Sequence, residues 1–230
     1  ILGKSDLDFT ANYTREGVNN RPALASATTN VGKNLMTLAT TFDQAWLQHY
    51  QNEDGTYADW NGLQIYNVNP YWDLYKNSNE STKNVYRFAA KAIYNINPHL
   101  KIQGTIGTDI NKMNFMEYIA YSSPQEQKGK MTTQQYNNRT LNAEILAMYN
   151  NSWGDFDLNA TAGGSIYKVD NKTSIALGKE EVFRDLKSIS NYSQQTAHED
   201  MYNKQINSLY GSASLGYKHT YYVDATVRGD

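Results

Sequence analysis

The side chains that could carry acid–base or metal chemistry are scattered along this sequence. The four histidines are His49, His99, His198 and His219. They lack the i, i+4 or strand-alternating spacing that places two metal ligands on one face. Adjacent or near-adjacent carboxylates occur at Asp6/Asp8, Glu180/Glu181 and Glu199/Asp200. Nothing singles out one pair to act across a sugar, as glycoside hydrolysis requires. We therefore expect no catalytic residue, no metal and no cofactor, with a glycan-cleaving enzyme that uses Glu180 or Glu181 as a rival.

An aromatic segment between residues 57 and 75 is the best candidate for binding. Its aromatic rings alternate with amides and carboxylates, a mixture that covers the apolar face of a sugar ring, binds its hydroxyls, or forms a protein interface. The candidate contact residues are Trp60, Tyr66, Asn69, Tyr71, Trp72 and Tyr75. The alternative is that this segment packs on itself. Because the segment belongs to a long irregular connection, the elements on either side must position it.

The stretch from residue 85 to residue 110 is the clearest of those elements. Its even positions are mostly apolar, and its odd positions include Arg87, Lys91, Lys101 and Asp109, on both sides of Asn97-Pro98-His99. Because side chains alternate between the faces of a strand, this pattern predicts a hairpin with one apolar face and a tight turn at 97–99. Each arm is about a dozen residues long, close to the ~9–11 residues that a tilted strand needs to cross a bilayer.

The same alternation recurs along the rest of the chain. Further strands are predicted at 6–14, 139–150, 156–166, 209–217 and 221–227, about seven in total. Long connections are predicted at 15–84, 111–138 and 169–203, and short turns at 97–99, 151–154 and 218–220. Alternation of long and short connections is typical of an outer-membrane barrel, with long outward loops and short inward turns.

Composition agrees with this architecture. The chain has 19 Tyr and 4 Trp against 6 Phe, and amphipathic aromatics gather at membrane interfaces. The predicted aromatic belt beside the short turns comprises Tyr94, Tyr149, Trp153, Phe156, Tyr217 and Tyr221. The net charge of −2 gives no reason to expect a nucleic-acid partner, and the absence of cysteine removes thiol chemistry. A soluble secreted β protein that binds glycans through the same aromatics is the alternative.

The predicted fold class is all-β, a partial antiparallel transmembrane β-barrel of about seven strands with long extracellular loops and short periplasmic turns. Single-chain bacterial barrels have even strand numbers of eight or more, so residues 1–230 are expected to be one part of a larger barrel domain. The polar strand residues most prominent on the opposite face are expected to line the lumen. They are Arg87, Lys91, Lys101, Asp109, Glu144 and Asp157.

Several segments resemble one known family. The run SLYGSASLGYKHTYYVDATVRGD at 208–230 is similar to the strand–turn–strand signature of SusC/RagA-type TonB-dependent outer-membrane transporters. NPYWDLYKN at 69–77 and YNINPHLKIQG at 94–104 resemble the barrel region upstream of that signature. The resemblance covers nearly the whole chain, but no plug domain or TonB box is recognised in it.

The resemblance implies a partner set and a location. It implies a large barrel in the outer membrane of a Gram-negative bacterium that imports oligosaccharides or peptides. A SusD-like surface lipoprotein would cap the barrel, and a TonB complex would supply energy through parts missing here. Outer-membrane lipid would surround it. The aromatic segment would then contact the lid, the substrate or only itself.

Overall fold

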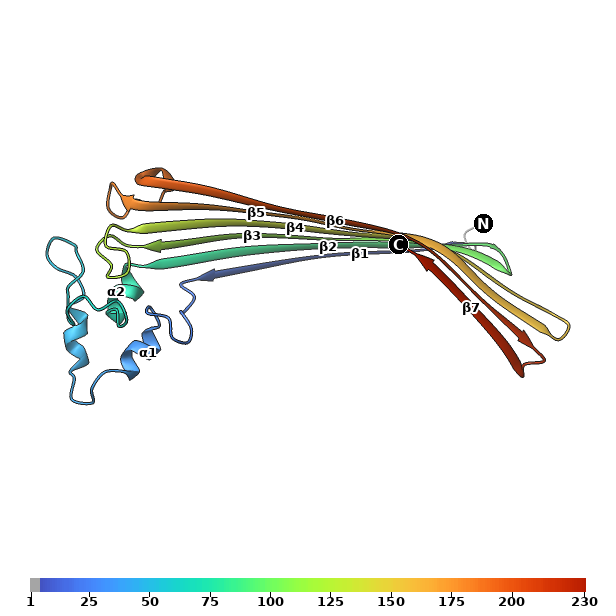
Figure 1. Cartoon of the computed structure of the whole chain (residues 1–230), viewed down its shortest axis with the longest axis horizontal. Coiled ribbons are helices and arrows are strands. Elements are labelled where there is room, and N and C mark those ends of the chain that lie inside the picture. The colour runs from blue at the N-terminus through green and yellow to red at the C-terminus, as the bar shows by residue number, and fades with distance from the viewer. Residues whose placement is uncertain (1–4) are drawn as a thin grey trace.

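The computed structural model describes residues 5–230, which form one antiparallel sheet whose seven strands follow the order of the chain (Figure 1). The strands are β1 (Ser5–Asn19), β2 (Ser78–Asn97), β3 (Leu100–Ile119), β4 (Lys130–Trp153), β5 (Phe156–Glu181), β6 (Tyr192–Tyr217) and β7 (Tyr221–Gly229). The helical elements are α1 (Val31–Met36), η2 (Gln44–Gln48), α2 (Pro70–Tyr75) and η3 (Ile189–Asn191). In this part of the chain, no helix has both the length and the apolar character needed to span a bilayer.

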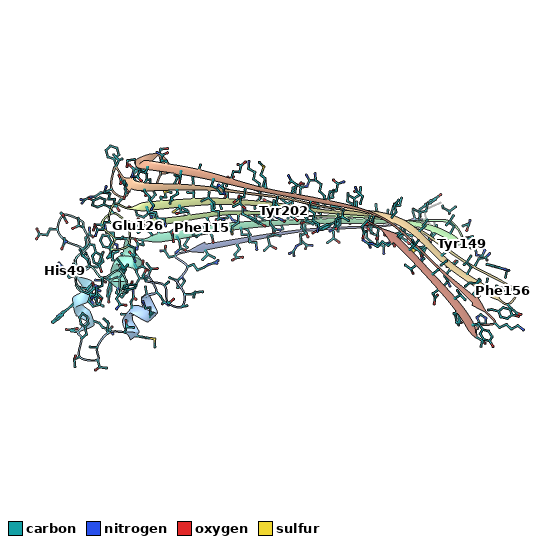
Figure 2. All side chains as sticks on the ribbon, in the orientation of Figure 1. His49, Phe115, Glu126, Tyr149, Phe156 and Tyr202 are labelled. Carbon is teal, nitrogen blue, oxygen red and sulfur yellow. The ribbon has the colours of Figure 1, made fainter. Side chains whose placement is uncertain are left out.

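Tight turns join the strands at one end of the sheet. In the first, the Asn97 side-chain oxygen accepts hydrogen bonds of 2.8 Å from the backbone N–H groups of both His99 and Leu100. The turn after β6 places Lys218 and His219 at φ angles of +52° and +50°, the left-handed region that short hairpin turns use. The predicted turns at 97–99 and 218–220 are confirmed, whereas β4 continues through Trp153, so the turn predicted at 151–154 lies at 154–155. In Figure 2, Tyr149 and Phe156 mark this end of the sheet, and His49 and Glu126 mark the other.

The connections at the opposite end are shorter than the sequence predicts. The predicted connections 111–138 and 169–203 prove to be mostly strand, leaving only residues 120–129 and 182–191 between strands. The prediction was wrong because apolar and polar residues no longer alternate by face in these extensions, where Met113, Phe115 and Ile119 lie on the otherwise polar face of β3, while the backbone ladder continues. Within residues 5–230, only the connection between β1 and β2 is long, and it spans 20–77 where the sequence predicted 15–84.

The strand register places one apolar face and one polar face across all seven strands. On the apolar face, Leu7 pairs with Ala92, and the same row continues through Gly104, Ile145 and beyond. The row ends with Gly164, Leu209 and Gly229. On β5 this apolar face runs from Phe156 to Ile166. Ten residue steps span roughly 33 Å along the strand.

The edge of the apolar band runs obliquely across the sheet. From β1 to β6, the first outward polar residues beyond the band are Arg15, Asn84, Lys112, Arg139, Lys168 and Asn207. Relative to the paired register, this edge is level from β1 to β3 and then falls by six residues from β3 to β6, so its average fall is six residues over five strand spacings. The fall is roughly 20 Å along the strands over about 24 Å across them, which gives a tilt of about 40°. A 33 Å strand segment at this tilt is about 25 Å tall, which matches the apolar band and the tilt of outer-membrane barrels.

Residues 20–77 fold into a cap with its own small core at the long-connection end of the sheet (Figure 1). Tyr57, Val68 and Trp72 form this core together with Tyr118 and Ala120, at the end of β3 and just beyond it. Tyr118 shares the even-numbered face of β3 with Ile110. The cap therefore lies on the continuation of the apolar face, beyond the band itself.

Candidate functional site: a two-faced wall and its cap

The polar face of the sheet carries all six of the residues predicted to line a lumen. Strand pairing places Arg87 opposite Asp109, and their side chains form a salt bridge with 3.6 Å between Nε and Oδ1. Asp157 accepts a 2.6 Å hydrogen bond from the Ser152 hydroxyl and lies 2.8 Å from the His219 ring. Lys91, Lys101 and Glu144 share this face because they pair with residues that also lie on it. They pair with Asp8, Asn95 and Ser165, respectively.

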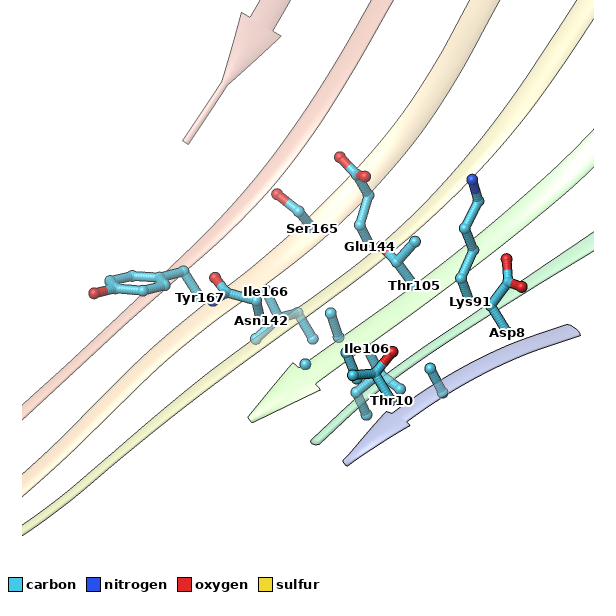
Figure 3. Close-up of a pocket in the computed structure, with 14 residues that line it drawn as sticks. Asp8, Thr10, Lys91, Thr105, Ile106, Asn142, Glu144, Ser165, Ile166 and Tyr167 are labelled. Atoms are coloured by element: carbon cyan, nitrogen blue, oxygen red, sulfur yellow. The ribbon is translucent and has the colours of Figure 1, made fainter. Parts of the chain in front are cut away.

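One row of this face crosses five strands as a line of polar groups. Asp8, Lys91, Thr105, Glu144 and Ser165 are successive register partners from β1 to β5. They line part of a shallow hollow of about 480 Å³, and Figure 3 shows Lys91, Thr105, Glu144 and Ser165 projecting to the same side. Such a row offers a cation, two hydroxyls and two carboxylates to a polar polypeptide or sugar. It carries no general acid–base pair in contact.

Sequence reasoning missed the partner of Glu144. The Tyr210 hydroxyl on β6 donates a hydrogen bond to Glu144, although β5 lies between the two strands. Arg228 on β7 lies over the Tyr210 ring, 5.7 Å from its centroid, and donates to the Ser208 hydroxyl at 3.1 Å. The alternation of apolar and polar residues does place Tyr210 and Arg228 on the polar face. Their contact across strands depended on the register, which the sequence alone does not give.

The apolar face exposes large hydrophobic side chains to the surroundings instead of packing them against a second layer. Examples are Leu7, Phe9, Ile106, Ile145 and Leu209, which are each at least half exposed. Contiguous exposed apolar surface of this extent marks a contact with a partner or a membrane. At the short-turn end, Trp153, Phe156, Tyr217 and Tyr221 form one row across four strands. The ring centroids of Phe156 and Tyr217 are 4.9 Å apart.

The six aromatic-segment candidates divide into buried and exposed residues. Asn69 is buried and caps α2, its Oδ1 accepting from the Tyr71 N–H and its Nδ2 donating to the Leu47 carbonyl. Trp72 is 1% exposed, and its Nε1–H donates to the Ser123 hydroxyl at 2.8 Å. Asn69 and Trp72 both stabilise the cap from within, as the self-packing alternative predicts for these two residues. Trp60 is half-buried against the cap core.

The exposed candidates lie on the surface of the cap. Tyr66 is 68% exposed and Tyr75 is 66% exposed. Tyr75 stacks between Tyr50 and the half-buried Tyr71, with centroid distances of 5.5 and 6.3 Å. These stacked rings present a flat aromatic surface of the kind that suits a sugar or a partner protein. Of the six candidate contact residues, Tyr66 and Tyr75 have exposed rings, Trp60 and Tyr71 have half-buried rings, and Asn69 and Trp72 are buried.

Two half-buried carboxylates, one within the cap and one at the end of β5, have raised pKa values. Burial raises the pKa of Asp73, whose carboxylate accepts a 2.8 Å hydrogen bond from Asn77. Burial and the nearby Asp185 raise the pKa of Glu181, which accepts from the Tyr118 hydroxyl at 3.1 Å. Desolvation also raises the pKa of Tyr118, so this hydroxyl stays protonated and donates.

The two rival catalytic carboxylates have separate partners. Glu180 forms a 3.0 Å salt bridge with Lys128, and hydrogen bonding to Lys128 and Ser193 lowers its pKa. Glu181 contacts Tyr118 instead. Neither contact resembles a pair held across a glycosidic bond.

Comparisons with known proteins agree with this architecture. No protein-family model matches the sequence, and no curated protein matches it. Among solved structures, the chain is similar to the RagAB peptide transporter with a TM-score of 0.70 and 16% identity, over 96% of this chain and 26% of that one. It is also similar to the RagAB peptide importer in its closed-closed and open-open states, with TM-scores of 0.69 and 0.68, 16% identity, and 25% of those chains covered.

This likeness establishes the fold. The chain is all-β and has the fold of part of a transporter β-barrel, in a sheet whose edges are β1 and β7. It spans about a quarter of the length of the chains that it matches. The predicted resemblance to the SusC/RagA type is confirmed at the level of the fold.

Proposed function

We propose that residues 1–230 are part of the wall of a TonB-dependent importer of the SusC/RagA type in the outer membrane of a Gram-negative bacterium. The observation that carries the proposal is the apolar band, about 25 Å tall at a tilt of about 40°, on one face of a sheet with the fold of a transporter barrel. Lipid would contact this face, and the opposite polar face would line the lumen or contact a plug. In this proposal the protein moves its substrate without covalent chemistry.

The proposed cargo is an oligosaccharide or a peptide, delivered together with a SusD-like surface lipoprotein. Support comes from the cap, whose exposed Tyr66 and Tyr75 offer flat aromatic contacts on the side of the sheet away from the short turns. The similar solved structures are described as a peptide transporter and a peptide importer, which favours testing peptides first.

Uptake by cells that express the complete barrel tests this proposal. Fluorescent oligosaccharides and peptides are supplied with and without the lipoprotein, and with and without a protonophore. We expect uptake of one cargo class that is lost on adding the protonophore. Uptake that is unchanged by the protonophore contradicts energised import. A protein that stays monomeric and folded in plain buffer without detergent contradicts the proposed membrane location.

The role of the cap is tested with a matched pair of variants. Tyr66→Ala with Tyr75→Ala removes the two exposed rings, whereas Tyr222→Ala removes a ring that is 58% exposed at the opposite end of the sheet. The cap variant should weaken lipoprotein binding or cargo affinity about tenfold, since aromatic anchors contribute most at interfaces. If the two variants bind lipoprotein and cargo with equal affinity, the exposed rings of the cap do not contribute to binding.

A further inference from the structure

A line of cations follows the edge of the apolar band at the end near the cap. On four of the six strands β1 to β6, the first outward side chain beyond the band is Lys or Arg. These four residues, the basic belt, are Arg15, Lys112, Arg139 and Lys168. At the short-turn end, the last outward residues are aromatic on β4 to β7 and are Ile96 and Leu100 on β2 and β3; none of them is charged, so the two edges of the band differ in charge.

Three members of the belt are close neighbours. Lys112 pairs with Asn137, two residues from Arg139, and Arg139 pairs with Asp170, two residues from Lys168. Lys112, Arg139 and Lys168 are therefore diagonal neighbours on three adjacent strands, roughly 7–8 Å apart at Cα. The three residues therefore form a diagonal line across β3, β4 and β5, along the edge of the apolar band.

The belt keeps most of its charge available. Lys168 lies 3.4 Å from Asp170, but within residues 5–230 no salt bridge or hydrogen bond joins a side chain to Arg15, Lys112 or Arg139. All three of these side chains are exposed. The cap contacts β3 at Met116 and Tyr118, further from the band, so it leaves Lys112 uncovered.

We propose that the basic belt binds the phosphate groups of an anionic lipid in the outer leaflet. This inference rests on the proposed membrane location of the apolar band. The cations lie where lipid headgroups meet hydrocarbon, and long Lys and Arg side chains place their charges at that depth. Arg139 offers a planar fork that suits phosphate, flanked by two lysine ammonium groups. The lipid's chains would lie along the apolar face that begins one step further down each strand.

Native mass spectrometry of the complete barrel with a phosphorylated lipid A tests the proposal. The belt variant carries Lys112→Gln and Arg139→Gln. The control carries Lys83→Gln and Lys130→Gln, which removes the same charge from the polar face of the sheet. Attraction of about fivefold per cation predicts roughly 25-fold weaker lipid binding for the belt variant and little change for the control. Dephosphorylated lipid A should bind the unmodified protein at least as weakly as the belt variant binds the phosphorylated form, because it loses the attraction to all four cations.

Several outcomes would overturn the proposal. Unchanged lipid binding by the belt variant contradicts it, and so does equal loss in both variants, which would indicate general charge attraction. Binding of inorganic phosphate alone with the same preference would assign the belt to a soluble anion. Insertion into lipid vesicles is measured in parallel. A protein that inserts but shows no phosphate preference refutes only this inference, whereas a protein that does not insert refutes the proposed location itself.

Discussion

Placing a positive charge in the apolar band tests which solvent that face meets. Ile106 lies near the middle of the band on β3 and is 51% exposed, so a lysine fits there without displacing packed neighbours. A Lys at the midplane of a barrel's lipid face costs about 2–4 kcal/mol. Ile106→Lys should therefore lower the folding equilibrium constant in lipid vesicles by roughly 30- to 700-fold.

The adjacent residue provides the control. Thr105 points to the polar face, where its register partners Lys91 and Glu144 carry opposite charges. Thr105→Lys should change the unfolding free energy by no more than about 0.5 kcal/mol. Both variants of the complete barrel are unfolded with urea from vesicles and followed by tryptophan fluorescence. Equal losses in the two variants, or a neutral Ile106→Lys, would refute the assignment of the faces.

Further predictions concern the cap and its contacts. Trp72→Ala removes a buried indole and its hydrogen bond to Ser123, so the unfolding free energy of the cap should fall by about 3–5 kcal/mol. Limited proteolysis should then cut residues 20–77 while the sheet stays intact. A cap that stays uncut would contradict the role of Trp72 in the cap core. Because burial raises the pKa of Glu181 above 4.5 in the folded state, ionisation of this carboxylate beside Asp185 lowers the stability of the folded arrangement as the pH rises from 4.5 through the raised pKa. Amide hydrogen exchange in residues 182–191, corrected for intrinsic rates, should become faster with rising pH in the unmodified protein. In Glu181→Gln the exchange should not depend on pH in this way. Identical profiles in the two proteins would contradict the role of Glu181.

The sequence predicted the wall well because one physical signal repeats along it. Alternation at 85–110 and in the other strands depends only on the contrast between an apolar face and a polar one, and the seven strands and their tight turns followed from it. The extensions of β3 to β6 escaped because apolar and polar residues are mixed on each face there: Asn137 and Asn138 lie on opposite faces, and so do Phe115 and Met116. Backbone hydrogen bonds, which leave no periodic signal, hold those segments together.

The cap was only partly predictable for a different reason. The aromatic composition of residues 57–75 indicated contact surfaces, but it could not distinguish a ring that binds a partner from one that fills a core. Trp72 and Tyr75 lie three residues apart, yet one is buried against Tyr118 and the other is exposed. That difference depends on how the cap packs on the end of β3, a long-range contact that no local pattern encodes.

Lipid accessibility of single cysteines tests the central claim most directly, and this chain contains no cysteine of its own. Spin labels at positions 106, 145 and 209 on the apolar face are compared with labels at 105, 144 and 208 on the polar face, in the complete barrel in vesicles. We predict that labels on the apolar face are relaxed by oxygen dissolved in the bilayer and shielded from a water-soluble nickel reagent, with the reverse for the polar face. Labels that respond alike on both faces, or an apolar face open to the nickel reagent, would contradict a wall embedded in lipid.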